Sequence, residues 1–494
     1  MDADVIIIGS GMGGATLAAA LAPSGRRILI LERGEHLRPS PQDRDADAIF
    51  GHGVFRPKEV WIDGQDRPFN PGNYYCVGGN SKFYGAALIR YRASDFDAVT
   101  HPGGATPGWP ISYSDLEEQY QAAEELYQVR GRETDDPTEP DHSGDYPHPP
   151  VPDEPDMADL RERIRRAGLH PSHIPLGVDL SAWLAAGQTT WDAYPNTCGA
   201  KMDAETCGLS HALSQENVSL RTGCAVTSLE TDQTGRVTAA VLDGGERITA
   251  PLIVLAAGAV QTAALLLRSA NDNCPTGLAN RSDQVGRNFM NHNCSAVLAL
   301  HPLRKNRSIY QKTLMLNDFY QRSNARPPLG NVQMLGKITG PILAATTPLP
   351  RLVAHWIAAR SFDFYAMSED LPNPDSRVTL KGGQIKLDWQ RSNWDAHLQL
   401  VQKLKSVLRR VGFPIVLSKA FDRRTPSHQC GTARMGDDPT QSVVDSYCRS
   451  HDHPNLFIVD ASVLPTSAAV NPALTVAALA LRAGQHISET EFAA

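Results

Sequence analysis

Asp4–Glu32 reads DVIIIGSGMGGATLAAALAPSGRRILILE, and this stretch decides the fold. Asp4–Ile8 is a run dominated by β-branched apolar residues, which is typical of a strand buried on both faces. Ala15–Leu21 predicts a helix of small residues that can lie close to a sheet, and Arg27–Glu32 predicts a second buried strand. A strand, a helix and a strand within about thirty residues form one βαβ unit. The sequence therefore predicts an α/β fold built on parallel strands.

The turn between the first strand and the helix carries a dinucleotide motif, G-x-G-x-x-G, at Gly9–Gly14. Gly9 permits the tight turn, Gly11 lets a pyrophosphate approach the backbone, and Gly14 allows close packing of helix on strand. Glu32 ends the second strand, where a carboxylate can accept hydrogen bonds from a ribose diol. A carboxylate at this place disfavours a 2′-phosphate, so the motif predicts a dinucleotide other than NADP.

Two distant segments favour FAD over NAD. Leu252–Gly258 (LIVLAAG) is a buried strand that opens into small residues, as expected where a second turn passes close to a cofactor. Asn455–Asp460 (NLFIVD) is a late buried strand that ends in an aspartate. A long cofactor held by both ends of the chain fits FAD, whereas each segment by itself is also compatible with plain core.

Composition describes an ordinary globular protein with two domains, since 494 residues exceed the size of one ordinary core. The net charge of −7 argues against a nucleic-acid partner. Eight cysteines without CxxC spacing predict reduced thiols in place of a metal site or disulfide scaffold. The chain runs directly into a core strand, and no apolar stretch is long enough to cross a bilayer, so we expect a cytoplasmic protein.

Elsewhere the chain predicts a capped helix over Ser112–Val129, with Ser112 or Ser114 as its N-cap, and a helix over Trp394–Val411. Residues 132–156 hold seven prolines and nine acidic residues, which fits either a solvated surface excursion or a mobile lid. Val218–Ala257 predicts an antiparallel meander that ends in the strand Leu252–Leu255. An alanine-rich helix is expected to begin near Pro472.

Together these motifs resemble the glucose–methanol–choline (GMC) oxidoreductase family. Besides GSGMGG with Glu32, the matching motifs are Val77–Gly85 (VGGNSKFYG), Ala200–Glu205 (AKMDAE), Leu255–Ala259 (LAAGA), His428–Gly436 (HQCGTARMG), Asp460–Pro465 (DASVLP) and Asn471–Thr475 (NPALT). Residues 300–420 carry weaker family marks, such as Pro374–Leu380 (PDSRVTL). The resemblance implies an FAD-binding Rossmann-type domain assembled from 1–95, 190–300 and 425–494. It also implies an α+β substrate domain with an antiparallel sheet, from 96–189 and 301–424.

The resemblance implies noncovalent FAD and a catalytic pair. By motif position, His428 matches the catalytic base of the family and Asn471 its hydrogen-bonding partner. A histidine suits a base near neutral pH, and an amide can hold an oxygen without titrating. Some family members link FAD to a histidine of the glycine-rich loop, but the matching residue here is Phe83, which cannot form that bond. The cofactor-binding residues implied are Gly9, Gly11, Met12, Gly14, Glu32, Arg33, Gly78, Gly79, Asn80, Ser81, Val226, Ala257, Gly258, Asp460, Ala461, Asn471, Pro472 and Thr475.

The predicted reaction is oxidation of a hydroxyl of a sugar, glycoside, aminoglycoside or related polyol to a carbonyl, by hydride transfer to flavin N5. Oxidation of a non-sugar alcohol and a non-redox, FAD-containing lyase are the alternatives. The electron acceptor is either O2 or a separate molecule, and no oligomeric state is predicted. Five aromatic residues are candidates to stack on a sugar ring, with core packing as the alternative for each: Trp356, Phe362, Phe364, Tyr365 and Trp389. Cys430 is expected to be a core residue, and no metal site is expected, His451-Asp452-His453 being read as a turn.

Overall fold

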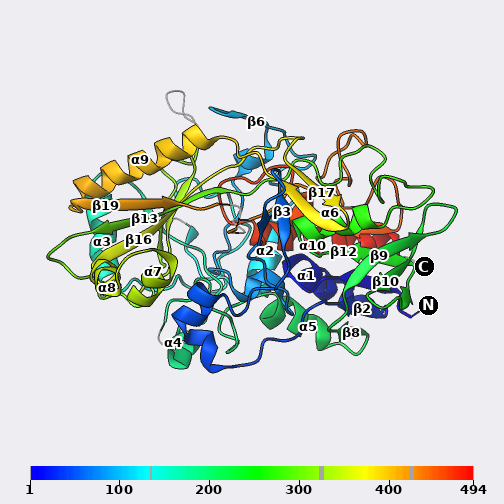
Figure 1. Cartoon of the computed structure of the whole chain (residues 1–494), viewed down its shortest axis with the longest axis horizontal. Coiled ribbons are helices and arrows are strands. Elements are labelled where there is room, and N and C mark those ends of the chain that lie inside the picture. The colour runs from blue at the N-terminus through cyan, green and yellow to red at the C-terminus, as the bar shows by residue number, and fades with distance from the viewer. Residues whose placement is uncertain are drawn as a thin grey trace.

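A parallel sheet and an antiparallel sheet organise the computed structural model, which describes residues 2–133, 136–187, 189–321, 328–422, 424–425 and 428–492. In Figure 1 the parallel sheet lies at the right, close to both termini. The antiparallel sheet lies at the left beneath helix α9 (Trp394–Arg410). The mixed α/β architecture predicted from the sequence is confirmed.

The parallel sheet has five strands in the order β20-β12-β1-β2-β8. Its central strand is buried along its whole length, which explains the unbroken apolar run at the start of the chain. The βαβ prediction is confirmed, because helix α1 (Met12–Leu21) joins two neighbouring parallel strands. The strands are β1 (Val5–Ile8), β2 (Ile28–Leu31), β8 (Val218–Arg221), β12 (Leu252–Leu255) and β20 (Leu456–Ile458).

The meander prediction is correct only in part. Strands β9 (Val226–Thr231), β10 (Val237–Leu242) and β11 (Arg247–Thr249) form a three-stranded antiparallel sheet. β8 instead pairs in parallel with β2, Val218 lying opposite Ile28. Its partner is therefore distant in sequence, and local turn patterns gave no indication of it.

Helix α1 packs against the last helix, α10 (Ala473–Thr490), because small residues line the contact. A Cβ on Gly484 of α10 would lie 2.6 Å from the Cβ of Ala20, so glycine is required at this approach. Tyr120 of α2 (Glu117–Leu126) joins its hydroxyl to Thr475 of α10 at 2.7 Å. The two ends of the chain are thereby held at one side of the parallel sheet, and α10 begins at the place predicted.

The antiparallel sheet has six strands in the order β19-β13-β16-β15-β14-β7. α9 covers one face, where His397 bridges Ser295 of β13 and Ser368 of β16 at 2.8 and 3.1 Å. Ala296, Leu298 and Leu300 of β13 alternate to the other face, where α7 and α8 pack. The elements are β7 (Pro171–His173), β13 (Asn293–Leu300), β14 (Leu314–Leu316), β15 (Asn331–Met334), β16 (Ser361–Ser368), β19 (Ile415–Ala420), α7 (Gly340–Thr346) and α8 (Arg351–Ala358).

A four-stranded sheet connects segments that are far apart in sequence, β18 pairing in parallel with β3. β13 lies in the segment 190–300 assigned to the FAD domain, yet it pairs with β16 and β19. The remaining elements are β3 (Trp61–Asp63), β4 (Pro68–Phe69), β5 (Val99–His101), β6 (Gly104–Thr106), β17 (Arg377–Lys381), β18 (Gln384–Asp388), α3 (Pro155–Arg166), α4 (Leu180–Gly187), α5 (Ser210–Leu213) and α6 (Ala259–Arg268).

The N-cap prediction for the helix after residue 111 is wrong. α2 begins at Glu117 with Leu116 as its N-cap residue. The Ser112 hydroxyl donates to the Asp115 carboxylate at 2.7 Å, so a local turn uses the side chain that the cap would have needed.

In its described part, which excludes Thr134 and Asp135, the acidic, proline-rich segment 132–156 lies at the surface and is attached to the body of the protein by several buried contacts. Asp136 is only 5% exposed and forms an ion pair with the buried Arg92. Tyr113 donates to the carbonyl of Asp141 at 2.7 Å. The segment is therefore packed against the body of the protein.

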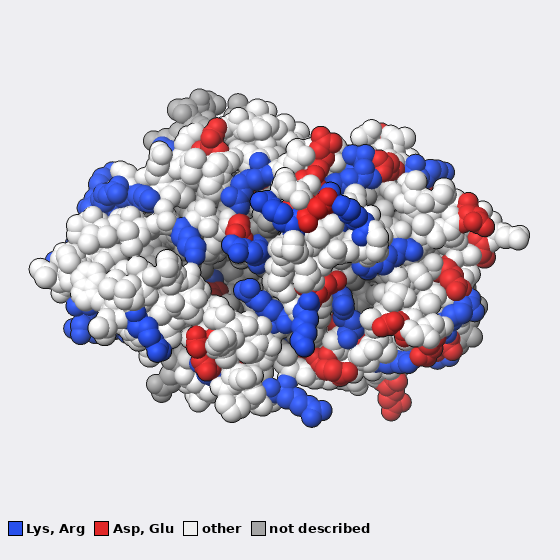
Figure 2. Space-filling view, viewed as in Figure 1, with Lys and Arg blue, Asp and Glu red and all other residues white. Residues whose placement is uncertain are grey.

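Charge is distributed unevenly over the face shown in Figure 2. Acidic and basic side chains are interspersed over the right-hand part, around the parallel sheet. At the left end, over α8, β19 and the C-terminal half of α9, basic side chains prevail in this view, whereas the first turn of α9 carries the acidic Asp395. On this face, the left end is therefore more basic than the net charge of −7 suggests.

Candidate functional site

The N-terminus of α1 is built to receive an anion. Gly11 is its N-cap residue, and no side chain caps the helix, so its first N–H groups are left for another partner. A Cβ on Gly11 would meet nothing within 4 Å, whereas one on Gly9 would lie 2.4 Å from the Ala256 carbonyl oxygen. One glycine thus serves close packing, and the other faces open space of the kind a pyrophosphate requires.

Glu32 lies at the end of β2 and holds the glycine loop in place. Its Oε2 atom accepts hydrogen bonds from the backbone N–H and the hydroxyl of Ser10, at 3.0 and 2.7 Å. The Ser10 hydroxyl in turn accepts the N–H of Gly78 at 3.0 Å. Ser10 therefore connects the two glycine-rich loops that the sequence predicted to meet at the cofactor, although no motif marked this serine as functional.

The second glycine loop lies directly beside the first. A Cβ on Gly79 would have the Cα of Gly11 as its nearest neighbour, at 3.7 Å. Gly78 has φ +85°, which glycine adopts without strain. Asn80 and Ser81 stabilise the loop itself, since Asn80 accepts the N–H of Tyr74 and the Ser81 hydroxyl donates to the carbonyl of Gly78.

Asp460 joins the two distant segments that the sequence predicted to lie at the cofactor, Leu252–Gly258 and Asn455–Asp460. Its carboxylate accepts the N–H of Gly258 at 2.9 Å and the hydroxyl of Thr262 at 2.5 Å. Burial raises the pKa of this carboxyl above its usual value. Ala257 and Gly258 precede helix α6, and Ala461 accepts the N–H of Gly431, so the two segments and the His428 motif lie together.

Some predicted cofactor residues already have partners of their own. The guanidinium of Arg33 stacks on Tyr75, 3.9 Å from the ring centroid. The hydroxyl of Thr475 is engaged by Tyr120. Val226 is partly buried at the start of β9, and Met12 and Pro472 lie at the N-termini of α1 and α10.

The donor set fits a dinucleotide. An uncapped helix N-terminus, open space at Gly11 and a buried carboxylate at the end of β2 are the three features that a dinucleotide site in this fold requires. The residues that would hold FAD are thus the two glycine loops, Glu32 and the Gly258–Asp460 pair.

The predicted catalytic pair comes together although its members are 43 residues apart. Asn471 Nδ2 lies 3.2 Å from His428 Nε2, and both residues are partly buried. His428 has φ +65°, an uncommon conformation for a histidine that the surrounding structure must impose. Burial, with added repulsion from His292 and Lys312, lowers the pKa of His428 well below its usual value, so the ring is neutral and able to take a proton.

A second histidine, His292, determines which nitrogen of His428 is free. His292 Nε2 lies 2.9 Å from the carbonyl oxygens of Ser467 and of Ala468, so this nitrogen must carry the hydrogen. The Nδ1 of neutral His292 is then an acceptor, and it lies 2.8 Å from His428 Nδ1. His428 therefore carries its hydrogen on Nδ1 and presents an unprotonated Nε2 to Asn471.

Two residues beside the pair, His292 and Gln333, carry no signal in the sequence. Gln333 Nε2 donates to Asn471 Oδ1 at 2.9 Å, which directs the Nδ2 of Asn471 toward His428. Tyr365 lies opposite Gln333 in the β15–β16 register, on the same face of the sheet. Only distance in space, not sequence spacing, relates these residues to the catalytic pair.

The other aromatic candidates occupy different places. Phe362 and Phe364 are buried, while Trp356 is 41% exposed on α8. Trp389 donates from its indole N–H to Asp370 at 2.7 Å. Tyr365 is therefore the aromatic candidate that shares a face of the sheet with Gln333, which contacts the catalytic pair.

Cys430 and the His-Asp-His segment show no sign of redox or metal-binding chemistry in their described surroundings. Burial raises the pKa of the Cys430 thiol well above its usual value, so the thiol stays protonated. His451 contacts Ser442 and Gly436, and His453 contacts Gly235 and Ala279, so the two rings have separate partners.

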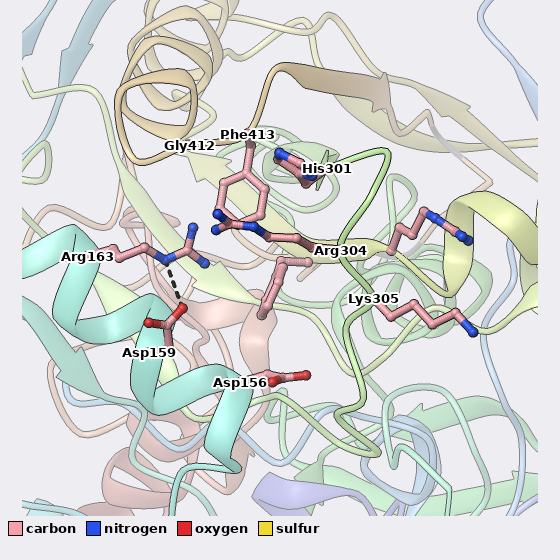
Figure 3. A pocket seen from close by; sticks show the side chains of 10 residues that line it. Asp156, Asp159, Arg163, His301, Arg304, Lys305, Gly412 and Phe413 are labelled. Atoms are coloured by element: carbon pink, nitrogen blue, oxygen red, sulfur yellow. Dashed lines mark ion pairs between the residues drawn. The ribbon is translucent and has the colours of Figure 1, made fainter.

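A cavity lies at the end of β13 that is remote from His292. Figure 3 shows cations from several elements around it, with Arg163 of α3 pointing toward Asp159. That ion pair has an N–O distance of 3.0 Å. Neither residue of the catalytic pair lines this cavity.

Within the described ranges, no helix combines the length and the apolar character that crossing a membrane requires.

Two protein families match parts of the chain. The family described as FAD dependent oxidoreductase matches residues 4–278. The C-terminal family described as GMC oxidoreductase matches residues 372–480. The second match contains His428 and Asn471, and the first contains both glycine loops.

Several curated proteins are similar over nearly the full length. The 6'''-hydroxyparomomycin C oxidase of Streptomyces lividus is 29% identical, over 98% of this chain and 91% of that protein. Paromamine 6'-oxidase of Streptomyces fradiae is 28% identical with the same coverage. The fructose dehydrogenase large subunit of Gluconobacter japonicus is 27% identical, over 99% of this chain and 98% of that protein.

Among solved structures, pyridoxine 4-oxidase from Mesorbium loti superposes with a TM-score of 0.67, at 20% identity, over 99% of both chains. At this identity the similarity establishes the fold alone.

Proposed function

The chain belongs to the FAD-dependent oxidoreductases, with a GMC-type C-terminal region, and from this premise we propose that it oxidises a hydroxyl of a sugar, aminoglycoside or related polyol to a carbonyl. The observation that carries the proposal is that Asn471 Nδ2 lies 3.2 Å from His428 Nε2, the nitrogen to which the hydrogen-bond network assigns no hydrogen. Bound FAD would supply the hydride acceptor.

His428 and Asn471 act on the substrate oxygen in two different ways. His428 Nε2 takes the hydroxyl proton, while an amide hydrogen of Asn471 holds the oxygen as the carbonyl forms. His428 is neutral over the ordinary pH range because burial lowers its pKa. The base therefore needs no deprotonation step before it acts.

Polar side chains near the pair favour a polyhydroxy substrate. The carbonyl oxygen of Gln333 is buried and has no hydrogen-bond partner among the described residues, so this side of the pair holds a hydrogen-bond acceptor of the kind that a hydroxyl would satisfy. Tyr365 lies beside it on the sheet. The oxidation of aminoglycosides and fructose by similar proteins, as their names state, supports the same substrate class.

We further propose that FAD is bound without a covalent link and that electrons pass to O2 or to a separate acceptor. The FAD-binding domain would comprise 1–95, 190–300 and 425–494, and the substrate domain the rest, although β13 at the end of the second segment pairs with strands of the substrate domain. All eight cysteines are free thiols, which supports the cytoplasm as the proposed compartment. A non-sugar alcohol as substrate remains the second candidate, because the 2-methyl-1,2-propanediol dehydrogenase of Mycolicibacterium austroafricanum is also 27% identical.

The test is anaerobic reduction of the FAD-loaded protein by sugars, glycosides, aminoglycosides and simple alcohols. A sugar or aminoglycoside should bleach the flavin, and air or a dye should restore the colour. His428→Ala should slow bleaching by on the order of 10²- to 10⁴-fold with FAD content unchanged. His211→Ala, which alters an exposed histidine, is the control. Turnover of a substrate without bleaching would identify the lyase alternative and refute the proposal.

A further inference from the structure

A chain of side-chain amides runs from Asn471 into the interior. Gln333 Nε2 donates to the Oδ1 atoms of Asn471 and Asn331, at 2.9 and 3.0 Å. Asn331 Nδ2 donates to Asn317 Oδ1 at 2.7 Å. Asn317 Nδ2 donates to the carboxylate of Asp136 at 2.6 Å. The four residues beyond Asn471 are each 5% exposed or less, so water cannot readily replace these bonds.

The direction of the chain is set at its remote end. Asp136 forms an ion pair with Arg92, and this guanidinium holds the pKa of the Asp136 carboxyl below its usual value although burial opposes it. An ionised carboxylate only accepts hydrogen bonds. Asn317 must therefore direct its NH2 group to Asp136 and its oxygen to Asn331, and each following amide takes its orientation from the one before it.

The opposite end of the chain gives the same direction independently. The backbone carbonyls beyond His292 require a hydrogen on Nδ1 of His428, which leaves Nε2 as an acceptor. The amide chain presents a donor, Asn471 Nδ2, to this nitrogen. The amide chain and the histidine pair thus meet where a donor, Asn471 Nδ2, faces an acceptor, His428 Nε2.

The alternative orientation of the Asn471 amide is unfavourable on both sides. A flipped amide would place its oxygen against the lone pair of His428 Nε2. It would also place its NH2 group against Nε2 of Gln333, which is itself a donor. Two favourable contacts would become two repulsive ones.

We propose that Gln333 is a positioning residue, which keeps the NH2 group of Asn471 directed at His428 and at the reacting oxygen. The Asp136–Arg92 ion pair fixes the orientation of Gln333 through the two amides between them. This inference rests on the proposed function. It also gives a role to the burial of Asp136, which anchors the chain of amides from within the segment 132–156.

The decisive variant is Gln333→Glu, which keeps the shape and removes the donor. A carboxylate at 333 accepts at both oxygens, so it repels Asn471 Oδ1 and favours the flipped amide. We expect flavin reduction to slow by on the order of 10²-fold. In an Asn471→Ala background the same change should have no further effect, because there is no amide left to orient.

Asn331→Asp is the matched control, since it also buries one new carboxylate in this chain. The carboxylate of this variant still accepts from Gln333 and leaves the donor to Asn471 in place, so its loss should be much smaller than that of Gln333→Glu. If the two variants lose equal activity, or if Gln333→Glu acts equally with and without Asn471, then the role of Gln333 is merely structural and the proposal is refuted.

A second measurement is independent of any substrate. The ¹⁵N spectrum of histidine-labelled, FAD-loaded protein reports the tautomer of His428, whose signals are identified by their loss in His428→Gln. The wild type and Asn331→Asp should show the Nδ1-protonated form, and Gln333→Glu should show a changed Nε2 resonance. An unchanged resonance would refute the positioning role. Absence of flavin reduction by every alcohol would instead count against the proposed function.

Discussion

His292 Nδ1 lies 2.8 Å from His428 Nδ1, and the two carbonyls at the other side of His292 decide which ring donates. A neutral imidazole has one donor and one acceptor, so the orientation of one ring determines the tautomer of the next. The base of the proposed reaction is therefore prepared by a residue on its Nδ1 side, opposite the Nε2 atom that would take the proton.

Replacing His292 should impair the base without removing it. His292→Phe deletes the acceptor for the Nδ1 hydrogen of His428, so the wrong tautomer becomes available. By analogy with tautomer loss in other histidine bases, we expect the rate of flavin reduction to fall by on the order of 10²- to 10⁴-fold. His292→Asn, which keeps an acceptor near the Nδ1 position, should recover part of the loss. Stopped-flow reduction measures both, and equal rates in the two variants would contradict this role.

The pH dependence should reflect the depressed pKa of His428. Only the neutral ring can accept the proton, so kcat/KM should rise with pH through a pKa well below 6.5 and stay level above it. The physical cause is burial, which disfavours the charged ring, with repulsion from His292 and Lys312 added. A profile of flavin reduction against pH tests this. A limb that is still rising above about pH 7 and is lost in His428→Ala would be inconsistent with it.

Replacement of Gly11 should weaken binding of the cofactor without lowering the stability of the fold. Its φ of −70° suits alanine, and the added Cβ would meet nothing within 4 Å. Gly11→Ala should therefore keep the melting temperature of the FAD-free protein while weakening FAD binding at least about tenfold, because the methyl group fills the space of the pyrophosphate. Fluorescence titration with FAD and thermal circular dichroism give the two values.

Gly13→Ala is the contrasting variant for that experiment. A Cβ there would lie 1.5 Å from the carbonyl oxygen of Val459, so the fold itself should suffer. If Gly11→Ala binds FAD as the wild type does, the pyrophosphate does not lie at this helix N-terminus.

FAD should leave the protein when the protein unfolds, because Phe83 occupies the position at which some family members have the linking histidine. Phe83 is buried and stacks on Tyr74 with ring centroids 3.6 Å apart, and the loop Val77–Gly85 contains no histidine. Precipitation with acid should therefore leave the yellow colour in the supernatant. A yellow pellet after washing would show a covalent link and overturn the expectation.

The sequence was informative where neighbours in the chain are neighbours in space. The βαβ unit with Gly9, Gly11 and Glu32 follows from local apolar patterns and turn requirements, and the structure confirms that unit. The contact between His292 and His428 joins residues 136 positions apart, and the one between Gln333 and Asn471 joins residues 138 apart. No periodicity links such residues, and only the family motifs predicted that His428 and Asn471 would meet.

Local predictions failed where a second interaction, near or distant in sequence, competes with the expected one. Ser112 is of a residue type favoured at an N-cap, yet its hydroxyl binds Asp115, and the helix begins five residues later at Glu117. β8 has the length and composition of a meander strand, but Val218 pairs with Ile28 because the edge of the parallel sheet offers unpaired backbone groups. In both cases the pattern of residue types along the chain does not show which of the competing interactions is more stable.

His397 should make the folded state sensitive to acid. It is fully buried between two serine hydroxyls, and burial, with repulsion from Arg391, lowers its pKa from 6.5 to about 3. Below pH 6.5 the unfolded chain binds a proton at this histidine, whereas the folded protein binds one only near pH 3. Protonation thus favours unfolding as the pH falls, and the stabilising contribution present above pH 6.5 is lost at about 1.4 kcal/mol per pH unit.

His397→Gln removes this titration and keeps a polar side chain between the serines. The free energy of unfolding of the wild type minus that of His397→Gln should therefore decrease as the pH falls from about 6.5 to about 4.5, by about 2–3 kcal/mol in total. Urea unfolding at several pH values measures it. Leu398→Gln, at the exposed neighbouring position on α9, introduces the same side chain without removing a titrating group, so its difference from the wild type should not vary with pH. A constant difference for His397→Gln as well would show that His397 is not held neutral in the folded protein.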